Sequence, residues 1–310
     1  MKNARKKKVI KEPVAKERPV IKTEMFFYFM AVLFVLEAAF LILRETKEYS
    51  PPVESARWFV EWPFSMTSAA PSGDMVYLVD SVANKCEIRD KVNWAITAEF
   101  SVKNPVYACA LEGGSAAILC KDPSRLEIYD KAVKKETLML KNVTIPLRVK
   151  SDTEGNLYVA DLGSAKLFKI NRQGSELFSI AASEDPKLSK WPGSFAVDRN
   201  QNVYMLDSEK KVRVYGKSGA YKTMWRASRM FNFNPQDDIA CGPDNLLYIL
   251  DRDGHRVLIY DTGGRHIARF SGGKASKNIL VYPGLLVFDD GHIYITTTGQ
   301  IIVLYLYGRK

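Results

Sequence analysis

The sequence predicts an all-β fold: a six-bladed β-propeller with an N-terminal strand closing the last blade, preceded by a single transmembrane α-helix. Three observations lead to this prediction: a proline that recurs at a nearly fixed interval, a short apolar segment that follows each proline, and one long apolar run near the N-terminus. The prolines stand 41 to 48 residues apart, at Pro63, Pro105, Pro146, Pro192, Pro235 and Pro283. A self-similar period of roughly 40–50 residues built from strands is typical of propeller blades.

Each repeat carries an apolar segment about a dozen residues after its proline. The six segments are Val76–Asp80, Ala117–Cys120, Leu157–Asp161, Val203–Asp207, Leu247–Asp251 and Ile293–Thr296. In the third repeat, three further strand-like runs accompany this segment, and clusters of Gly, Asn, Asp and Ser separate the four. Four short strands divided by such turns are what one propeller blade requires.

Aspartates end four of these segments, and a basic residue follows each of them four or five residues later. The pairs are Asp80 with Lys85, Asp161 with Lys166, Asp207 with Lys211, and Asp251 with Arg256. We expect them to bridge the turn inside each blade as exposed ion pairs, which are worth about 0–1 kcal/mol each.

The two ends of the repeat region predict how the ring closes. The sixth repeat stops after its third strand, at Ile301–Tyr307, and has no fourth strand of its own. Residues Arg57–Trp62, before the first proline, resemble the fourth strands of other repeats. We expect this segment to complete the last blade, because pairing there removes an open sheet edge. The propeller is therefore predicted to span residues 57–310.

One apolar run predicts a membrane anchor. Met25–Leu43 holds nineteen residues with a single charge, and at about 1.5 Å per residue it is long enough for the hydrocarbon core of a bilayer. Residues 1–24 carry nine Lys or Arg against three Glu, and such an excess stays in the cytoplasm. We expect a basic, disordered cytoplasmic tail at 1–24, a single-pass helix at 25–43, a linker at 44–56, and an extracytoplasmic propeller, in the periplasm or the extracellular space.

Glu37 is the one acidic or basic residue of this apolar run. A carboxylate in hydrocarbon costs about 2.5–3.5 kcal/mol on insertion scales, so it usually has a polar partner. Two interpretations stay open. Either a single-pass helix tolerates this glutamate, protonated or directed toward the interface, or Glu37 meets a donor on another transmembrane helix. The second interpretation makes the chain a subunit of a membrane complex with a protein partner.

Charge and cysteine content narrow the classes of partner. The chain has a formal net charge of +10, of which the tail supplies six (nine bases minus three acids), so the propeller is only mildly basic. An extracytoplasmic location also disfavours nucleic acid, and none is expected as a partner. The cysteines, at 86, 109, 120 and 241, lie in apolar strand patterns without C-x-x-C spacing. We interpret them as buried hydrophobes rather than as disulfides or metal ligands.

Several repeats resemble the NHL family. The segment Asp251–Asp261 reads DRDGHRVLIYD, and Gly264 and Arg265 follow it. Gly155–Asp161 and Trp191–Asp198 match other parts of the NHL signature. The resemblance extends over the whole ring and is closest in the third to fifth repeats. It implies a six-bladed propeller, but such propellers include both binding modules and enzymes, so the fold does not determine the function.

The sequence contains no catalytic constellation. His255, His266 and His292 occupy turn or outer-strand positions of the repeat, without a second ligand at metal spacing. G-x-S-x-G, H-E-x-x-H and phosphate-binding glycine loops are absent. Related propellers include metal-dependent lactonases, with ligands in the central channel, and lyases that use zinc. Here the predicted innermost strands are apolar or small except for Arg148 and Lys150, so we expect no metal and no other cofactor.

Longer connections between the later blades form the candidate binding surface. Loops on a rigid scaffold commonly carry binding residues, and aromatics mixed with Arg are typical of interfaces. The candidate contact residues are Lys187, Lys190, Trp191, Arg226, Arg229, Phe231, Phe233, Lys274 and Lys277. The competing interpretation is a set of solvated loops whose aromatics fill gaps between blades. We therefore predict an extracytoplasmic protein-binding or scaffold subunit, with a metal-dependent propeller hydrolase or lyase as the alternative.

Overall fold

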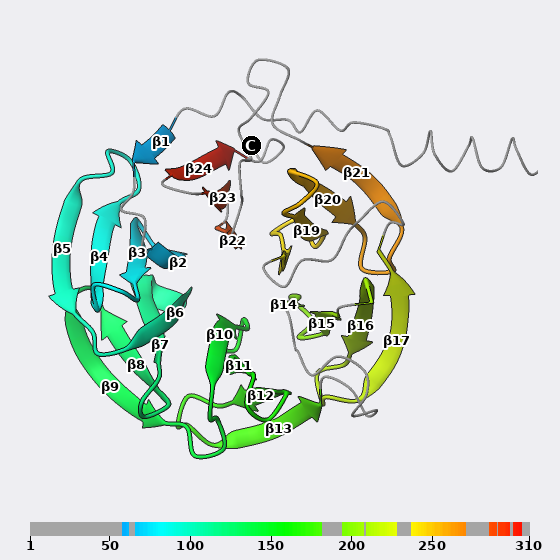
Figure 1. Ribbon diagram of the computed structural model, residues 1–310, viewed down its shortest axis with the longest axis horizontal. Coiled ribbons are helices and arrows are strands. Elements are labelled where there is room, and N and C mark those ends of the chain that lie inside the picture. The colour runs from blue at the N-terminus through cyan, green and yellow to red at the C-terminus, as the bar shows by residue number, and fades with distance from the viewer. Residues whose placement is uncertain are drawn as a thin grey trace, which may run out of the picture. The chain divides into compact units, whose positions relative to one another are not determined.

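The chain folds as a ring of six four-stranded antiparallel sheets (Figure 1). The computed structural model describes residues 58–61, 66–181, 194–207, 209–227, 237–270, 285–289, 291–297 and 300–305. All of them belong to one compact unit, Lys47–Lys310. The prediction of an all-β, six-bladed propeller is therefore confirmed.

The blades follow one another along the chain, and within blades 1 to 5 the strands run in sequence order from the centre of the ring outward. Blade 1 contains β2 (Met66–Ser72), β3 (Met75–Asp80), β4 (Lys85–Asp90) and β5 (Ile96–Ser101). Blade 2 contains β6 (Pro105–Ala110), the 3₁₀ turn η1 (Glu112–Gly114), β7 (Ser115–Cys120), β8 (Arg125–Asp130) and β9 (Val133–Met139). Blade 3 contains β10 (Pro146–Ser151), β11 (Leu157–Asp161), β12 (Lys166–Ile170) and β13 (Glu176–Ala181). Blade 4 contains β14 (Ser194–Val197), β15 (Val203–Leu206), β16 (Lys211–Tyr215) and β17 (Tyr221–Arg226). Blade 5 contains β18 (Asp238–Cys241), β19 (Leu247–Asp251), β20 (Arg256–Tyr260) and β21 (His266–Phe270).

Blade 6 is built from both ends of the propeller. Its inner strands are β22 (Leu285–Phe288), β23 (His292–Thr297) and β24 (Gln300–Tyr305), and its outer strand is β1 (Trp58–Glu61). β1 pairs antiparallel with β24, with Trp58 opposite Val303 and Glu61 opposite Gln300. The predicted closure by the N-terminal strand is thus present in the strand order.

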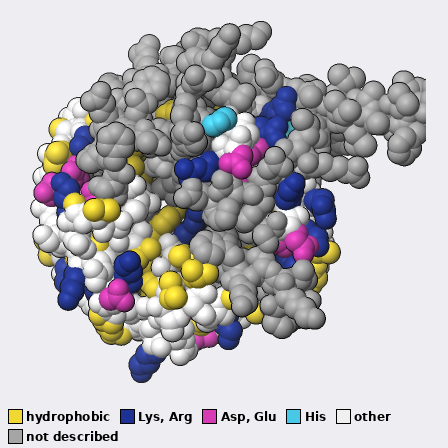
Figure 2. All heavy atoms as spheres, in the orientation of Figure 1, with side chains coloured by type: hydrophobic (Ala, Val, Ile, Leu, Met, Phe, Trp, Pro, Cys, Tyr) yellow, Lys and Arg dark blue, Asp and Glu magenta, His cyan; other side chains and the backbone are white. Residues whose placement is uncertain are grey.

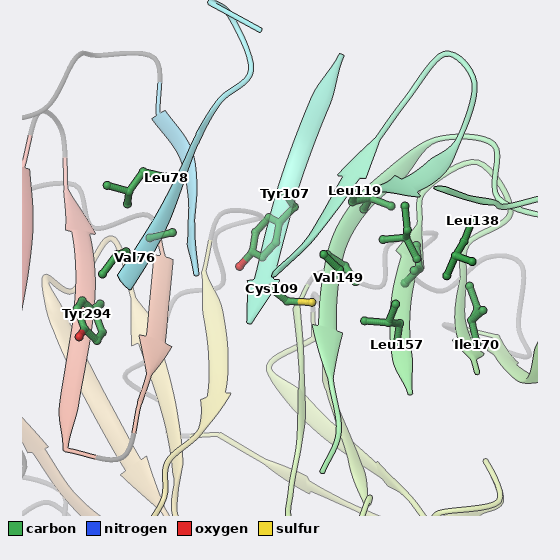
Figure 3. Packing of buried hydrophobic residues seen from close by; sticks show 14 of the residues in the cluster. Val76, Leu78, Tyr107, Cys109, Leu119, Leu138, Val149, Leu157, Ile170 and Tyr294 are labelled. Atoms are coloured by element: carbon green, nitrogen blue, oxygen red, sulfur yellow. The ribbon is translucent and has the colours of Figure 1, made fainter. Parts of the chain in front are cut away.

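Apolar side chains fill the spaces between neighbouring blades. The second strand of a blade is buried on both faces, because one sheet stacks on each side of it; in β3, Val76–Val79 are all fully buried. Figure 3 shows one cluster continuing from Tyr294 of blade 6 through Val76 and Leu78 to Leu119 of blade 2. Burying a side chain of this size contributes about 1.5–3 kcal/mol. The same apolar packing therefore joins the last blade to the first, beside the strand exchange.

In contrast to this core, the outer strands of blades 1 to 4 have mostly exposed side chains. In β9, six of the seven residues are exposed, and the same strand carries two lysines and a glutamate. Charged edge residues oppose pairing with a second chain. On the face shown in Figure 2, basic side chains are spread around the perimeter of the ring.

An aspartate–tyrosine hydrogen bond recurs in four blades. In each of them, the buried tyrosine of the second strand donates its hydroxyl to an aspartate near the end of the first strand. The pairs are Tyr158 with Asp152 (3.3 Å), Tyr204 with Asp198 (3.0 Å), Tyr248 with Asp244 (2.6 Å) and Tyr294 with Asp289 (2.7 Å). A buried hydroxyl needs a partner, and a carboxylate is a strong acceptor. This bond fixes the inner hairpin of the blade.

The predicted ion pairs across the second turn are only partly correct. Asp251 pairs with Arg256 at 2.6 Å, as expected, but the pair is largely buried rather than exposed. Asp161 instead uses its carboxylate to accept backbone hydrogen bonds from Ile145 (2.6 Å) and Ser164 (2.9 Å), so Lys166 forms no ion pair with it. Lys85 instead pairs with Glu87 on its own strand and Glu99 on the adjacent strand, and Lys211 pairs with Glu209 in the turn before β16.

Within the residues that the structure describes, no helix is long and apolar enough to cross a bilayer. The predicted tail at 1–24, the predicted helix Met25–Leu43 with Glu37, and the predicted linker at 44–56 all lie outside those residues.

Candidate functional site

One pairing position on the six innermost strands forms a layer around the centre of the ring. In the first five repeats the residue at this position pairs with the penultimate residue of the apolar segment, and in the sixth it pairs with Thr296, the last residue of the segment. The layer consists of Ser68, Tyr107, Arg148, Ser194, Asp238 and Leu285. Lys150 lies two residues beyond Arg148 on β10. We call Arg148, Lys150, Ser194 and Asp238 the central cluster.

Asp238 joins innermost strands of four blades. Its carboxylate accepts hydrogen bonds from Arg148 Nη1 at 2.5 Å, from the Ser194 hydroxyl, from the backbone N–H of Ile239 at 3.0 Å and from the backbone N–H of Leu286 at 3.0 Å. These donors come from β10, β14, β18 and β22. The side chain is fully buried. The carboxylate is therefore a bridge between blades 3, 4, 5 and 6.

The charges around Asp238 decide its protonation state. Burial alone raises the pKa of this carboxyl group, but the charges of Lys150 and Arg148 and the bond from Ser194 outweigh burial and hold the pKa below its usual value. Asp238 is therefore ionised at neutral pH. A buried carboxylate of this kind persists because it is paired and hydrogen-bonded.

The Lys150 side chain extends past blade 4 and contacts β18, the strand that carries Asp238. Its Nζ donates to the backbone carbonyl of Ile239 at 2.7 Å and lies 3.5 Å from Asp238 Oδ1. It also lies 5.7 Å from the centre of the Phe195 ring. Burial lowers the pKa of Lys150, and the nearby Asp238 only partly offsets this effect.

Arg148 and Lys150 keep some access to solvent. Their side chains are 13% and 18% exposed, whereas that of Asp238 is 0% exposed. Basic atoms are visible in the hollow near the middle of the face in Figure 2. Arg148 remains charged, because the field of Asp238 outweighs burial and raises the pKa of the guanidinium. The cluster thus presents cationic groups toward the ring axis while its carboxylate is enclosed.

Tyr107 adds a polar group without a partner to the same layer. Its ring lies 6.0 Å from the Arg148 guanidinium carbon, and its hydroxyl is buried without a hydrogen-bond partner among the residues described. Burial raises the pKa of this phenol strongly, so it stays protonated and can donate. Figure 3 shows Tyr107 between Leu78 and Leu119 of the apolar cluster, on the same strand as Cys109.

Backbone irregularity helps to place these side chains. The register shifts between Pro105 and Tyr107 on β6 and between Pro146 and Arg148 on β10. The two prolines occupy the first position of their strands, where a missing N–H is tolerated, and a bulge at this point re-aims the following side chain. The recurring proline is therefore a marker of the central layer.

The sequence prediction of the innermost strands was wrong in one respect. It gave Arg148 and Lys150 as the exceptions to apolar or small residues, and so missed the charged Asp238, which is the first residue of β18. Tyr107 and Ser194 were also overlooked. One sequence signal marks four of the blades: the layer residue follows the recurring proline by two positions in β6, β10, β14 and β22.

Arg226 is the one candidate binding-loop residue that the structure describes. It is the last residue of β17 and is exposed. Lys187, Lys190, Trp191, Arg229, Phe231, Phe233, Lys274 and Lys277 lie outside the described residues. The arrangement of the nine residues relative to one another therefore stays a prediction.

Histidines and cysteines lie away from any metal-type arrangement. His255 has a left-handed backbone (φ 49°) in the turn before β20, as its turn position predicts, and His292 Nδ1 lies 2.9 Å from Asp289 Oδ1. In the described part of the chain, no three His, Cys, Asp or Glu side chains converge. The four cysteines are free thiols, and burial raises the pKa of each to about 12.

Comparisons with known proteins establish the fold alone. No protein-family profile and no curated protein sequence matches the chain. The structure is similar to virginiamycin B lyase from Staphylococcus aureus, with a TM-score of 0.60 and 12% identity over 81% of this chain and 99% of that one. A streptogramin B lyase gives a TM-score of 0.59 and 13% identity, over 82% of this chain and 97% of that one.

Two further solved structures add to this picture. A protein of unknown function from Bacteroides caccae has a TM-score of 0.55 and 14% identity, over 74% of this chain and 95% of that one. Another structure is a histidine-to-alanine variant of the Staphylococcus aureus lyase, described as catalytically inactive and solved with quinupristin; its TM-score is 0.59, with 12% identity over 81% of this chain and 99% of that one. The chain is thus a six-bladed β-propeller similar in structure to virginiamycin B lyase.

Proposed function

We propose that this chain is a single-pass membrane protein whose propeller lies outside the cytoplasm and serves as a protein-binding or scaffold subunit of an envelope membrane complex. One observation carries the proposal: the carboxylate at the centre of the ring is saturated by donors from four blades. A carboxylate used in this way holds the ring together and is not available as a general base or a metal ligand. The ring is therefore best suited to act as a rigid frame.

Binding then falls to the connections that the frame supports. Residues 182–193 join β13 to β14, residues 228–236 lead into β18, and residues 271–284 lead into β22. They carry eight of the nine candidate contact residues, and they enter the strands that hold Ser194, Asp238 and Leu286. Loops anchored on a rigid scaffold are common binding elements. This arrangement supports a binding face on the side of the ring where the innermost strands begin.

The membrane part of the proposal rests on sequence. The apolar run Met25–Leu43 follows a basic tail, which places the tail inside and the propeller outside. Glu37 supplies a contact for a partner helix, since an acidic group in hydrocarbon is stabilised by a polar neighbour. Repeats such as DRDGHRVLIYD at Asp251–Asp261 further lead us to propose that the ring is an NHL-type propeller.

A metal-dependent hydrolase or lyase has less support. In the lyase of similar fold, replacing one histidine by alanine gives an inactive protein. The three histidines of this chain lie in a turn, on an outer strand and at the start of a second strand. Metal analysis of the purified full chain tests this alternative: one equivalent of bound zinc or calcium would favour it over the binding module.

Affinity purification from native membranes tests the binding face. We expect the full chain to co-purify with a protein partner, and a Lys187→Ala, Lys190→Ala, Trp191→Ala variant to lose it. The matched control replaces Lys134, Lys135 and Val133 on the outer strand β9 by alanine, which removes the same charges and an exposed apolar side chain. Retention of the partner by the loop variant would contradict the proposed face.

Topology and the role of Glu37 are tested separately. Protease added to spheroplasts should digest the propeller and spare the tail; survival of the propeller would contradict the extracytoplasmic location. Glu37→Leu should weaken co-purification of a membrane partner, and Ala38→Leu is the neighbouring control. Equal recovery with both variants would discard the helix contact while leaving the binding face intact.

A further inference from the structure

We propose that the centre of the ring binds a small monocarboxylate through Arg148, Lys150 and Tyr107. This inference is independent of the partner-binding function, because it rests on groups that face the ring axis rather than on the loops. It assigns a ligand class to a region whose carboxylate is already committed to holding the blades together.

The charge balance of the central cluster is the first argument. Arg148 and Lys150 both pair directly with one carboxylate, that of Asp238, while the neighbouring Asp237 adds a weaker negative field at Arg148, so the direct ion pairs join two bases to one acid. Both cations are more than four-fifths buried, where water screens charge poorly and Coulomb forces are stronger than in bulk water. A surplus buried charge is stabilised by a counter-ion. One negative charge satisfies the cluster.

Unused hydrogen-bond donors are the second argument. Arg148 Nη1 donates to Asp238 at 2.5 Å and to Ser194 at 3.1 Å. Its Nη2 makes a long contact of 3.5 Å with the Asp237 carbonyl. Its Nε donates to none of the described residues. Lys150 has three N–H donors, and the carbonyl of Ile239 takes one of them. A guanidinium and an ammonium side by side are well suited to the two oxygens of a carboxylate.

The Tyr107 hydroxyl is the third argument, independent of charge. It is buried next to Arg148 in the same layer, and none of the described residues accepts its proton. Buried polar groups are nearly always hydrogen-bonded, and the exceptions mark places where an ion, a ligand or a function supplies the partner. A protonated phenol needs an acceptor, and an oxyanion held by Arg148 provides one.

Charge matching selects the ligand among anions. A carboxylate brings the cluster to neutrality, whereas a phosphate dianion leaves one uncompensated negative charge beside the buried Asp238. A metal cation would add to an existing positive surplus. The site therefore favours a compact monoanion with two oxygens, for which acetate is the simplest probe.

The test is a titration of the purified full chain in detergent with sodium acetate, at constant ionic strength balanced with sodium chloride. A ligand that binds the folded state raises the thermal midpoint in a concentration-dependent way. Parallel titrations use inorganic phosphate, and line broadening of ¹³C-acetate measures binding without unfolding. We expect saturable stabilisation by acetate and a weaker effect of phosphate. No saturable acetate effect, or a stronger effect of phosphate, would overturn the proposal.

Variants of the site should change the affinity for acetate in predicted directions. Arg148→Gln should weaken acetate binding about tenfold or more, since charged hydrogen bonds are lost. Asp238→Asn should strengthen acetate binding, because the variant lacks the carboxylate with which Arg148 and Lys150 pair. Tyr107→Phe is isosteric and should weaken binding about threefold, so it keeps the proposal testable even if the other two variants fail to fold. Arg172→Gln, an exposed base in a turn of blade 3, is the control for general anion effects. Equal acetate affinity in Tyr107→Phe and the control would overturn the assignment of Tyr107, and equal affinity in Arg148→Gln would overturn the site.

Discussion

Arg148 and Asp238 lie ninety residues apart in the sequence and form an ion pair of 2.5 Å across the centre of the ring. They belong to blades 3 and 5, so the contact passes over the blade between them. Ser194 of that blade donates to the same carboxylate. Three consecutive blades are therefore tied together at the ring centre by one buried charge.

Breaking this pair should destabilise the whole propeller. Arg148→Met leaves a buried carboxylate with less compensation, and we expect a loss of about 3–5 kcal/mol in the free energy of unfolding. The double variant Arg148→Met, Asp238→Asn should recover part of that loss, because no unpaired charge remains. Urea denaturation of the two single variants and the double variant gives the coupling energy. An additive result would show that the two side chains do not interact.

Asp161 should make the free energy of unfolding decrease at acidic pH. Burial alone raises the pKa of this carboxyl group, but hydrogen bonds from Ser164, Ile145 and Thr144 outweigh it and hold the pKa below its usual value. A carboxyl group with a depressed folded-state pKa contributes stability that is present above the unfolded pKa of about 3.9 and is lost as pH falls toward the folded value. Unfolding of Asp161→Asn, followed from pH 6 to pH 2, should show a shallower decline than the parent. An unchanged slope would contradict the shifted pKa.

The aspartate–tyrosine bond should contribute measurably in each blade that has it. Tyr294→Phe removes the 2.7 Å bond to Asp289 from a buried site, and we expect a loss of about 0.5–1.5 kcal/mol. Tyr221→Phe is the matched control, because Tyr221 is 56% exposed on an outer strand. Thermal unfolding of both variants makes the comparison. Equal midpoints for the two variants would show that the hydroxyl of Tyr294 adds nothing.

The thiols should be inert in the folded protein. Burial raises the pKa of all four cysteines to about 12, and the thiolate is the reactive form. A colorimetric thiol reagent at pH 8 should react slowly with the native chain and titrate four groups after unfolding in guanidinium. Rapid labelling of a native thiol would contradict this, and mass spectrometry of the labelled peptide would identify the residue.

Periodicity made the architecture predictable from sequence. Six copies of the segment represented by Leu157–Asp161 gave the number of blades, and the missing fourth strand after Tyr307 gave the closure. These features depend on local patterns of apolar residues and turns, which every blade repeats. For the same reason the segments Leu157–Asp161 and Leu247–Asp251, predicted in the third and fifth repeats, have the same bounds as β11 and β19.

The central cluster was harder to predict because it depends on single residues in different repeats. Asp238 precedes an apolar run, and a strand predicted from hydrophobicity begins after it. Its partner Arg148 is visible in the sequence, but the contact between them follows from the geometry of the ring rather than from spacing. The layer residue follows its proline by two positions in β6, β10, β14 and β22, but by three in β18 and by five in β2, which obscures the alignment. The aspartate–tyrosine bond was equally hidden, since the two residues are four to six positions apart.

The strand exchange in blade 6 has a consequence for biosynthesis. β1 is the first propeller strand to be translated and its partner β24 is the last. Trp58 and Val303, which pair in the folded protein, are separated by 245 positions (303 minus 58) in the sequence. Five blades can assemble while the nascent chain is still growing, but the circle stays open until β24 has been translated. The entropic cost of bringing two such segments together rises only slowly with the length of chain between them. A chain that stopped before Gln300 would therefore carry every strand of blades 1 to 5 but leave β1 without its partner, as an open arc rather than a closed circle.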